Sequence, residues 1–236
     1  MRVSTSPAYA VHARRAWMWP LALVSLTLAW DATGLDLVVM SWLGDSAGFA
    51  WRDAPLLKTV LHDGARQMAW GLLAGVMVSA ALPWGPWRRL TGRQRVVAIS
   101  GLFMSLLAIN LFKFTSQTSC PWELQAFGGA AQYVSHWSWG VDDGGSGRCF
   151  PGGHASAAFA FWALVWPWLT SPRVDDQRLG QRLAVVIAVA GVVLGTAQTL
   201  RGAHYPSHTL WTAVICGAVS WVWHRAWAPG PRRVFV

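Results

Sequence analysis

The 236-residue chain is 54% hydrophobic, only 12% of its residues are charged, and its formal net charge is +9. A soluble domain has about 25% charged residues, and a disordered chain has few apolar residues and many charges, so the composition excludes both classes. Tryptophan, which favours the membrane–water boundary, occurs 18 times. These features predict an integral membrane protein, and the length fits one helical bundle, a single domain over residues 1–236.

Six apolar stretches without a charged residue follow one another along the chain: Ala16–Trp30, Gln67–Trp87, Val96–Phe112, Ala155–Pro172, Leu183–Leu200 and Thr209–Trp223. A membrane-spanning helix needs roughly 20 apolar residues, so the first and last stretches must include flanking residues. The first stretch could instead be a secretory signal peptide, but no suitable cleavage site follows it. The prediction is an all-α fold of six transmembrane helices in one bundle, with tails at residues 1–15 and 226–236.

The cationic side chains cluster between the apolar stretches and do not form one patch, which argues against a nucleic-acid-binding protein. Thirteen of the 19 cations lie in the N-terminal tail, in the second-to-third and fourth-to-fifth connections, and at the C-terminal end from Arg225 onward. The positive-inside rule then predicts that both termini are cytoplasmic. Segments 31–66, 113–154 and 201–208 are expected to face outward, and 36–66 is expected to form an interfacial helix. The preference for Arg over Lys is compatible with a bacterium, so we expect the inner membrane with outward loops in the periplasm.

Ionisable residues collect in the three outward segments. Five of the seven histidines lie there, and three of the six cations in these segments are candidates with them: His62, His136, His154, His204, His208, Lys113, Arg148 and Arg201. Ionisable groups at the ends of membrane helices are candidate functional residues. Because they gather at one face and not at mid-span, the pattern argues against a transporter. An interfacial polar rim is the alternative for any single residue among them.

Residues 149–154 read Cys-Phe-Pro-Gly-Gly-His and immediately precede the fourth apolar stretch. Successive glycine N–H groups ahead of a helix form a site for an anion. Gly152 and Gly153 are therefore candidate phosphate donors, with His154 beside the phosphate or its leaving group. The alternative is an ordinary Pro-Gly turn at the start of the span.

A second polar segment spans residues 198–208. Gln198 and Arg201 are three residues apart and share a helical face. His204 and His208 are four residues apart. Pro206 lies between these two histidines and is expected to end the preceding helix. Two histidines at this spacing can bind zinc, but no third ligand is evident. We therefore predict no metal and no other cofactor.

Three short motifs resemble those of the type 2 phosphatidic acid phosphatase family, the membrane relatives of vanadium haloperoxidases. The family patterns are K-x6-R-P, P-S-G-H and S-R-x5-H-x3-D. This chain keeps their order and spacing in residues 113–121, 151–154 and 197–208. The motif positions that it retains are Lys113, Pro121, Pro151, Gly153, His154 and His204. The resemblance covers roughly residues 60–225 in layout.

The chain also departs from these motifs. Cys120 and Gln198 stand where the family has arginine, Gly152 where it has serine, and His208 where it has aspartate. Two nearby cations are expected to substitute, because arginine suits forked contacts with phosphate oxygens. One is Arg201, one helical turn beyond Gln198, and the other is Arg148, just before the Pro-Gly-Gly turn.

The resemblance implies a phosphoryl transfer in two steps, with His204 as nucleophile and His154 as general acid and then base. Three cations and two backbone amides would neutralise the negative charge on the phosphate oxygens, namely Lys113, Arg148, Arg201 and the N–H groups of Gly152 and Gly153. Either His208 or Asp63 would orient His204, and the sequence leaves that choice open. Gln198 would position the residues that contact phosphate without contacting phosphate itself.

The expected function is hydrolysis of a lipid-linked phosphate monoester or diphosphate, such as lipid A, undecaprenyl diphosphate or a phospholipid phosphate. One alternative is a lipid phosphotransferase that uses the same site, and another is a catalytically inactive phospholipid-binding membrane protein. The expected partners are the lipid-linked substrate and membrane lipids, with no nucleic acid and no obligatory protein partner.

Cys120 and Cys149 both fall in the outward 113–154 segment, where an oxidising compartment permits a disulfide. A bond between them would close a loop of about 30 residues, which by chain entropy stabilises a fold by roughly 3–4 kcal/mol. It would also tie the segment after Lys113 to the Pro-Gly-Gly turn. The alternative is two unrelated thiols. Cys216 lies in the sixth stretch and is expected to be a buried, unpaired thiol.

Overall fold

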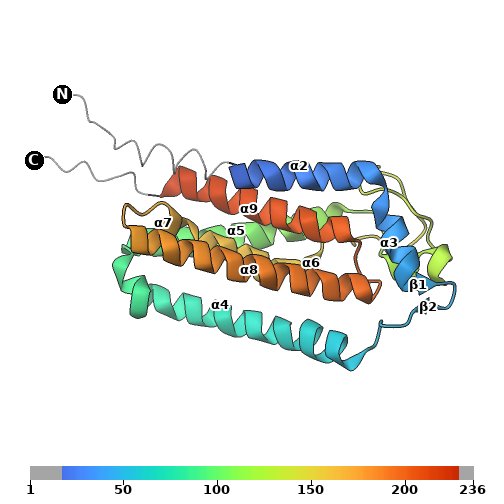
Figure 1. Ribbon diagram of the computed structural model, residues 1–236, viewed down its shortest axis with the longest axis horizontal. Coiled ribbons are helices and arrows are strands. Elements are labelled where there is room, and N and C mark those ends of the chain that lie inside the picture. Colours follow the sequence, from blue (N-terminus) through green and yellow to red (C-terminus); the bar gives the residue numbers. More distant parts are fainter. Residues whose placement is uncertain (1–17, 229–236) are drawn as a thin grey trace, which may run out of the picture.

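The computed structural model describes residues 18–228, and this part of the chain is mostly helical (Figure 1). The α-helices are α2 (Met18–Thr33), α3 (Leu35–Leu43), α4 (Ala65–Ala81), α5 (Gly92–Thr115), α6 (Gly153–Phe159), α7 (Trp166–Leu169), α8 (Val174–Leu200) and α9 (Pro206–Trp227). A π-helical segment (Leu56–Gly64) leads directly into α4, and a 3₁₀ segment (Ala160–Leu164) separates α6 from α7. Shorter 3₁₀ turns are Gly85–Arg89, Pro121–Glu123 and Gln125–Phe127.

The long helices run roughly along one direction, with α4 at one edge of the bundle (Figure 1). Helix α5 packs against α9, and α6 packs against α8. The start of α2 and the end of α9 lie at one end of the bundle. Helix α3, the α8–α9 junction and a small antiparallel hairpin of β1 (Gly44–Asp45) and β2 (Gly48–Phe49) lie at the other. The three segments expected to face outward therefore gather at one end of the bundle.

Three helical stretches are long and apolar enough to cross a membrane: Leu56–Arg89, Gly92–Thr115 and Val174–Leu200. Helices α2 and α3 form a fourth candidate if this pair, bent by 73°, is one span. The described residues thus contain three to four candidate spans, fewer than the six expected from the apolar stretches. Large apolar side chains remain exposed along the candidate spans, such as Trp70 (65%), Phe103 (42%) and Val186 (64%). An exposed apolar surface of this kind suits contact with lipid.

The stretch Ala155–Pro172 differs most from its expected form, because it is three short helical pieces and not one continuous helix. Pro167 lies in the first turn of α7, where its missing N–H and fixed φ are tolerated. A proline inside a long helix would have removed a backbone hydrogen bond. The chain therefore begins a new helix at this point.

Pro206 also acts differently from the prediction. It was expected to end the preceding helix, but α8 already ends at Leu200 and Pro206 begins α9. Proline suits the first position of a helix for the reason given for Pro167. The segment expected to hold an interfacial helix contains α3 and the π-helical segment Leu56–Gly64.

The core of the bundle lies between α5, α6 and α9, and includes the buried side chains of Leu102, Ile109, Phe159 and Cys216. Gly191 lets α8 approach this core, because a Cβ at that position would lie only 2.3 Å from the ring of Phe159. The close packing of α6 on α8 fixes the turn just before α6 relative to the end of α8. These two elements carry most of the motif residues.

Cys120 and Cys149 form a disulfide, and their Cα atoms lie 5.1 Å apart. The bond links the segment that follows α5 to the segment that precedes α6. The same two segments are joined by backbone hydrogen bonds from Arg148 to Ser116 (2.7 Å) and from Cys149 to Thr118 (2.9 Å). Cys216 is a buried free thiol in the core.

The cysteine arrangement predicts the number of reactive thiols. Labelling of denatured, unreduced protein should modify one cysteine, Cys216, because a disulfide carries no thiol. Labelling after reduction should modify three, and mass spectrometry of the labelled chain distinguishes the two results. Three labelled cysteines without reduction would contradict the disulfide.

Candidate active site

Side chains from four parts of the chain meet at the end of the bundle that holds the α8–α9 junction. His62 comes from the π-helical segment before α4, Lys113 from the end of α5, and His154 from the start of α6. Arg201 and His204 come from the α8–α9 junction. The structure thus brings together residues separated by up to 142 positions in the chain. Helix packing, and not local sequence, creates this cluster.

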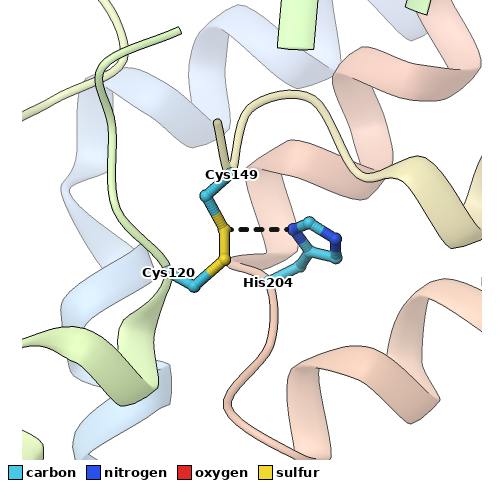
Figure 2. Close-up of side chains that lie close together, drawn as sticks. All are labelled: Cys120, Cys149 and His204. Carbon is cyan, nitrogen blue, oxygen red and sulfur yellow. Dashed lines mark hydrogen bonds between the residues drawn. A yellow bond between two sulfur atoms is a disulfide. The ribbon is translucent and has the colours of Figure 1, made fainter. Parts of the chain in front are cut away.

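His204 is buried, with 5% of its surface exposed. Its Nδ1 lies 3.3 Å from Sγ of Cys149, and Figure 2 shows the imidazole ring directed at the disulfide. Sγ of Cys149 also lies 3.2 Å from the backbone oxygen of Ala203, the residue before His204. The disulfide is therefore in contact with both the ring and the backbone of this segment.

The environment of His204 favours its neutral form. Burial lowers the pKa of His204 well below its ordinary value, and the nearby positive charge of Lys113 lowers it further. Both effects disfavour a second proton on the ring. A neutral imidazole at neutral pH is the form that can act as a nucleophile.

The lowered pKa of His204 predicts a dependence of stability on pH. Unfolded histidine has a pKa of about 6.5, so below that pH the unfolded chain binds a proton that folded His204 does not. The free energy of unfolding should therefore fall as the pH drops from about 6.5 toward the lower folded pKa. Unfolding of wild type in detergent should show this loss, and His204→Gln should show a smaller one. Parallel curves for the two proteins would contradict the prediction.

His154 is half-buried at the start of α6 and its ring packs against that of His62, with centroids 3.8 Å apart and the planes tilted by 31°. Nδ1 of His62 lies 2.8 Å from Oδ1 of Asp63. Asp63 was expected as a possible partner of His204, but the structure pairs it with its neighbour His62. The π-helical backbone brings His62 to the site, and no motif in the sequence signalled it. The sequence signal that could have indicated a functional role for His62 was its position in an outward segment, four residues before the basic residue Arg66.

Arg201 is buried and held on two sides. Its Nε donates a hydrogen bond to the backbone oxygen of Arg52 (2.8 Å), and its Nη1 donates to Oε1 of Gln198 (3.2 Å). The side-chain hydrogen bonds of Arg201 to described residues use Nε and Nη1, which leaves Nη2 available. Arg201 and Lys113 both interact electrostatically with His154. The helical spacing of Gln198 and Arg201 thus gives a buried pair in which the amide positions the guanidinium.

The turn after Arg201 depends on Gly202. Its φ is +75°, in the left-handed region, and a Cβ there would lie 2.2 Å from the ring of Phe49. The backbone oxygen of Gly202 accepts a hydrogen bond from the N–H of Trp122 (2.9 Å). Phe49, from β2, is buried and packs on Phe127. The hairpin therefore rests directly on the turn that joins Arg201 to His204.

Replacing Gly202 by alanine should destabilise the fold by about 1–3 kcal/mol, because it adds backbone strain and a clash with Phe49. Gly34→Ala is the matched control, since Gly34 also has a positive φ (66°) but a Cβ there would meet nothing within 4 Å. Thermal unfolding in detergent should show a larger loss for Gly202→Ala. Equal losses would mean that the contact with Phe49 does not matter.

The Pro-Gly-Gly turn differs from its expected role at one glycine. The N–H of Gly152 donates to the backbone oxygen of His208 (3.2 Å), and the Thr212 hydroxyl donates to the oxygen of Gly152 (3.0 Å). The Gly152 amide is therefore engaged in holding the turn against α9 and is not free for phosphate. Gly153 lies beside Lys113, since a Cβ at Gly153 would be 3.8 Å from Nζ.

Arg148 also lies apart from the predicted cluster. It is exposed, has a φ of 57°, and its guanidinium lies over the ring of Phe114 at 5.1 Å from the ring centre. A cation over an aromatic face is attracted by the ring electrons. No contact of Arg148 with the histidines is present in the described part of the chain. The cations whose charge acts on His154 are Lys113, Arg201 and Arg66.

His208 is fully buried at the start of α9, and neither ring nitrogen has a hydrogen-bond partner among the described residues. Its ring centre lies 5.7 Å from that of His204 and 5.2 Å from that of Phe150. His208 was expected as a possible acceptor for His204, but the structure has no hydrogen bond between them. Its ring fills space among aromatic neighbours, and its backbone oxygen holds Gly152.

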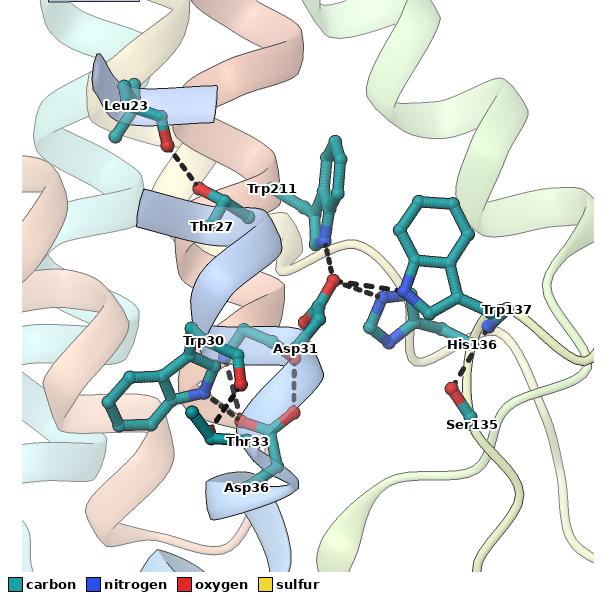
Figure 3. A network of polar contacts seen from close by, with 11 residues as sticks. Leu23, Thr27, Trp30, Asp31, Thr33, Asp36, Ser135, His136, Trp137 and Trp211 are labelled. Atoms are coloured by element: carbon teal, nitrogen blue, oxygen red, sulfur yellow. Dashed lines mark hydrogen bonds and ion pairs between the residues drawn. The ribbon is translucent and has the colours of Figure 1, made fainter. Parts of the chain in front are cut away.

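Two aspartates, the partly buried Asp31 in α2 and the buried Asp36 in α3, hold the neighbouring segments together (Figure 3). Asp31 accepts hydrogen bonds from the indole N–H groups of Trp137 (3.0 Å) and Trp211 (2.7 Å), and Nε2 of His136 lies 3.3 Å away. Asp36 accepts from the N–H of Ser207 (3.0 Å), one of the N–H groups at the start of α9 that lacks a partner within the helix. These contacts fix α9 beside the site.

His136 belongs to this bracing and not to the candidate site. Its ring stacks in parallel on Phe150, with centroids 4.3 Å apart. Phe150 immediately precedes the Pro-Gly-Gly turn, so the aspartate network supports that turn from outside. The sequence placed His136 among the candidate functional residues of the outward segments, without a specific role.

One group of three possible metal ligands occurs in the described part of the chain, namely Cys120, Cys149 and His204. The two sulfurs are joined in the disulfide. Thiolate, and not disulfide sulfur, is the ligand that zinc takes from cysteine. The oxidised group therefore does not fit a zinc centre.

Comparison with known proteins supports the assignment from the motifs. The model of the PAP2 superfamily matches residues 95–230, which include all but the first three residues of α5 and every motif residue. No curated protein and no solved structure matches the chain. Members of the superfamily are phosphatases. From the motif residues, their convergence at one end of the bundle and this match over more than half of the sequence, we conclude that the chain belongs to the PAP2 superfamily.

Proposed function

We propose that this protein is an integral membrane phosphatase that hydrolyses a lipid-linked phosphate ester or anhydride through a phosphohistidine. The observation that carries the proposal is the convergence of His204, His154, Lys113 and Arg201 at one end of the bundle. Membership of the PAP2 superfamily supports hydrolysis of phosphoric esters. The apolar side chains exposed along the long helices support a membrane location.

In the first step, Nε2 of His204 attacks phosphorus, and the bond between phosphorus and the leaving oxygen breaks. His154 gives its proton to that oxygen, so the product leaves as a neutral hydroxyl. Lys113 and the free Nη2 of Arg201 stabilise the negative charge on the remaining phosphate oxygens. Arginine suits this position because it can contact two oxygens at once.

In the second step, His154, now neutral, takes a proton from water while the water oxygen attacks phosphorus. The bond between phosphorus and Nε2 breaks, inorganic phosphate leaves, and His154 is again protonated for the next cycle. The tilted contact with the His62 ring restricts the orientations open to the His154 ring. Because Lys113 and Arg201 supply the positive charge, activity should persist in a chelator.

The proposed topology has six spans, namely α2, α4, α5, the broken α6–α7 segment, α8 and α9, with both termini cytoplasmic. The proposed location is a bacterial inner membrane, with the candidate site on the periplasmic side. A site at the ends of lipid-facing helices lies at the depth of lipid headgroups, which is where a lipid-linked phosphate would be held. Cysteine-accessibility labelling of the loops in intact cells tests this topology.

Phosphate release tests the proposed reaction. Purified protein in detergent should release inorganic phosphate from at least one of lipid A, undecaprenyl diphosphate, phosphatidylglycerol phosphate and phosphatidic acid. It should act more slowly on a water-soluble phosphate ester. Rapid quenching with a ³²P-labelled substrate should trap an acid-labile, base-stable phosphoprotein in wild type but not in His204→Gln. Absence of release and of a phosphoprotein with every lipid would refute the proposal.

The same site would serve a phosphotransferase if a lipid hydroxyl replaced water in the second step. Adding candidate acceptor lipids to the assay distinguishes the two reactions. A hydrolase keeps releasing inorganic phosphate, whereas a transferase passes the label to the acceptor lipid.

A further inference from the structure

The nucleophile of the proposed reaction needs a specific proton arrangement. If Nε2 of His204 attacks phosphorus, its lone pair must be free, so the ring proton must lie on Nδ1. The tautomer of a histidine is set by the hydrogen bond that its other nitrogen makes. A carboxylate usually fixes a catalytic histidine in this way, and the third motif of the resembling family ends in aspartate. In this chain that position is His208.

No described carboxylate is bonded to His204. Asp63 is 2.8 Å from His62, Asp31 accepts the indole N–H groups, and Asp36 accepts from Ser207. His208 has no hydrogen-bond partner at either ring nitrogen among the described residues, and its ring centre is 5.7 Å from that of His204. The groups that the sequence offered as orienting partners are therefore used elsewhere or unpaired.

The disulfide occupies the position that a carboxylate would take. Sγ of Cys149 is 3.3 Å from Nδ1 of His204, and both residues are buried (Figure 2). A disulfide sulfur carries no proton and can only accept. In this contact the ring must therefore be the donor, which puts the proton on Nδ1 and leaves the Nε2 lone pair free.

We propose that Cys149, as half of the Cys120–Cys149 disulfide, is a positioning residue that fixes the tautomer and orientation of His204. The inference rests on the proposed function, since it assigns a role within the same site. The crosslink holds the acceptor in place, because Cys120 follows α5 and Cys149 precedes α6. Sγ of Cys149 also lies 3.2 Å from the Ala203 backbone oxygen, so it is packed against the segment that carries His204.

A neutral sulfur acceptor differs from a carboxylate in its effect on charge. It selects the tautomer but does not stabilise a doubly protonated ring. This agrees with the burial of His204, which lowers its pKa and keeps the ring neutral. The disulfide thus supplies orientation while the surroundings supply the neutral state.

Two double variants separate an acceptor from a simple crosslink. The pair Cys120→Ala with Cys149→Ala removes the hydrogen-bond acceptor and the crosslink. The pair Cys120→Ala with Cys149→Asp removes the crosslink but supplies an oxygen acceptor near the position of the former sulfur. The alanine pair should lower kcat about 10- to 100-fold with little change in KM, as loss of a positioning partner does. The aspartate pair should regain most of that loss. Both pairs should lose similar thermal stability.

Equal kcat values for the two double variants would overturn the inference. The disulfide would then be only a structural crosslink. Cys216→Ala is the control for removal of a cysteine as such, because Cys216 lies in the core and is not part of the site. If wild type itself releases no phosphate, the proposed function fails, and the kinetic comparison cannot be made. A measurement that is independent of activity then decides on the inference alone.

That measurement is the tautomer of His204 in the wild-type protein. With ¹⁵N-labelled histidine in detergent, the His204 signals are those lost in His204→Gln. A protonated Nδ1 and an unprotonated Nε2 are expected in the oxidised protein, and a mixture of tautomers in the alanine pair. A proton on Nε2 of wild type would overturn the inference whether or not the protein is active.

Discussion

Replacing His204 by glutamine should lower phosphate release on the order of 10³-fold or more, because loss of a nucleophile removes the covalent route altogether. The initial rate with the best lipid substrate measures this. Glutamine is close in size and polar, so the buried pocket of His204 stays filled. Loss of the trapped phosphoprotein together with the rate would assign the loss to the covalent step.

His154→Gln should also be severely impaired, by about 10²- to 10⁴-fold, since general acid–base catalysis contributes this much. Its defect should shrink with a p-nitrophenyl ester, whose leaving group needs no proton, while the defect of His204→Gln should not. This difference separates the acid from the nucleophile. Equal defects with both types of leaving group would contradict the assigned roles.

His224→Gln is the matched control for both variants. His224 is buried like His204, with 6% of its surface exposed, but lies at the far end of α9, where Nε2 is 3.2 Å from the hydroxyl of Thr170. Its replacement should alter stability without a large change in kcat. A loss of activity as deep as that of His204→Gln would show that burial, and not chemistry, explains the effect. A residual rate in His204→Gln of more than a few per cent would contradict the covalent mechanism.

The sequence predicted the long helices where a continuous apolar stretch contains no breaking residue. The stretches Val96–Phe112 and Leu183–Leu200 lie within α5 and α8, which extend further at polar ends. Helix α5 begins at a capping box formed by Thr91 and Gln94, a local signal that hydropathy does not weigh. The prediction of one continuous helix over Ala155–Pro172 was wrong, because apolar composition cannot distinguish one helix from three short helical pieces.

The candidate site was predictable where spacing along one segment carries the information. The motif spacing selected Lys113, His154 and His204, and the three-residue spacing of Gln198 and Arg201 anticipated their contact. Position along the chain does not reveal which side chains meet across segments. For this reason Asp63 was predicted as a possible orienting partner of His204, although in the structure it pairs with the adjacent His62.

The remaining differences at the site have the same physical origin. The N–H of Gly152 is engaged because α9 presents the His208 carbonyl to it, and that approach depends on helix packing. Arg148 has a positive φ and its guanidinium lies over Phe114, a placement that its position just before the Pro-Gly-Gly turn did not indicate. The contact of the disulfide with His204 arises from three separate segments and has no signature in any one of them.

Arg201→Lys should lower kcat/KM by about 10²- to 10³-fold, the usual effect of removing a preorganised donor at a developing charge. Lysine keeps the charge but cannot donate to Arg52, Gln198 and a phosphate oxygen from one planar group. Its ammonium is also strongly hydrated and ill suited to this buried position. The rate with the best lipid substrate, at the same detergent concentration, measures the loss.

Gln198→Ala should be milder, because it removes one support of Arg201 and leaves the bond to the Arg52 backbone in place. Arg173→Lys is the matched control, since Arg173 is an exposed arginine that precedes the opposite end of the same helix. It should keep the wild-type rate. If Gln198→Ala were the more damaging of the two site variants, the amide and not Arg201 would be the phosphate contact. Arg201 would then not be the substitute for the missing motif arginine, and its buried position would serve the turn at Gly202 instead.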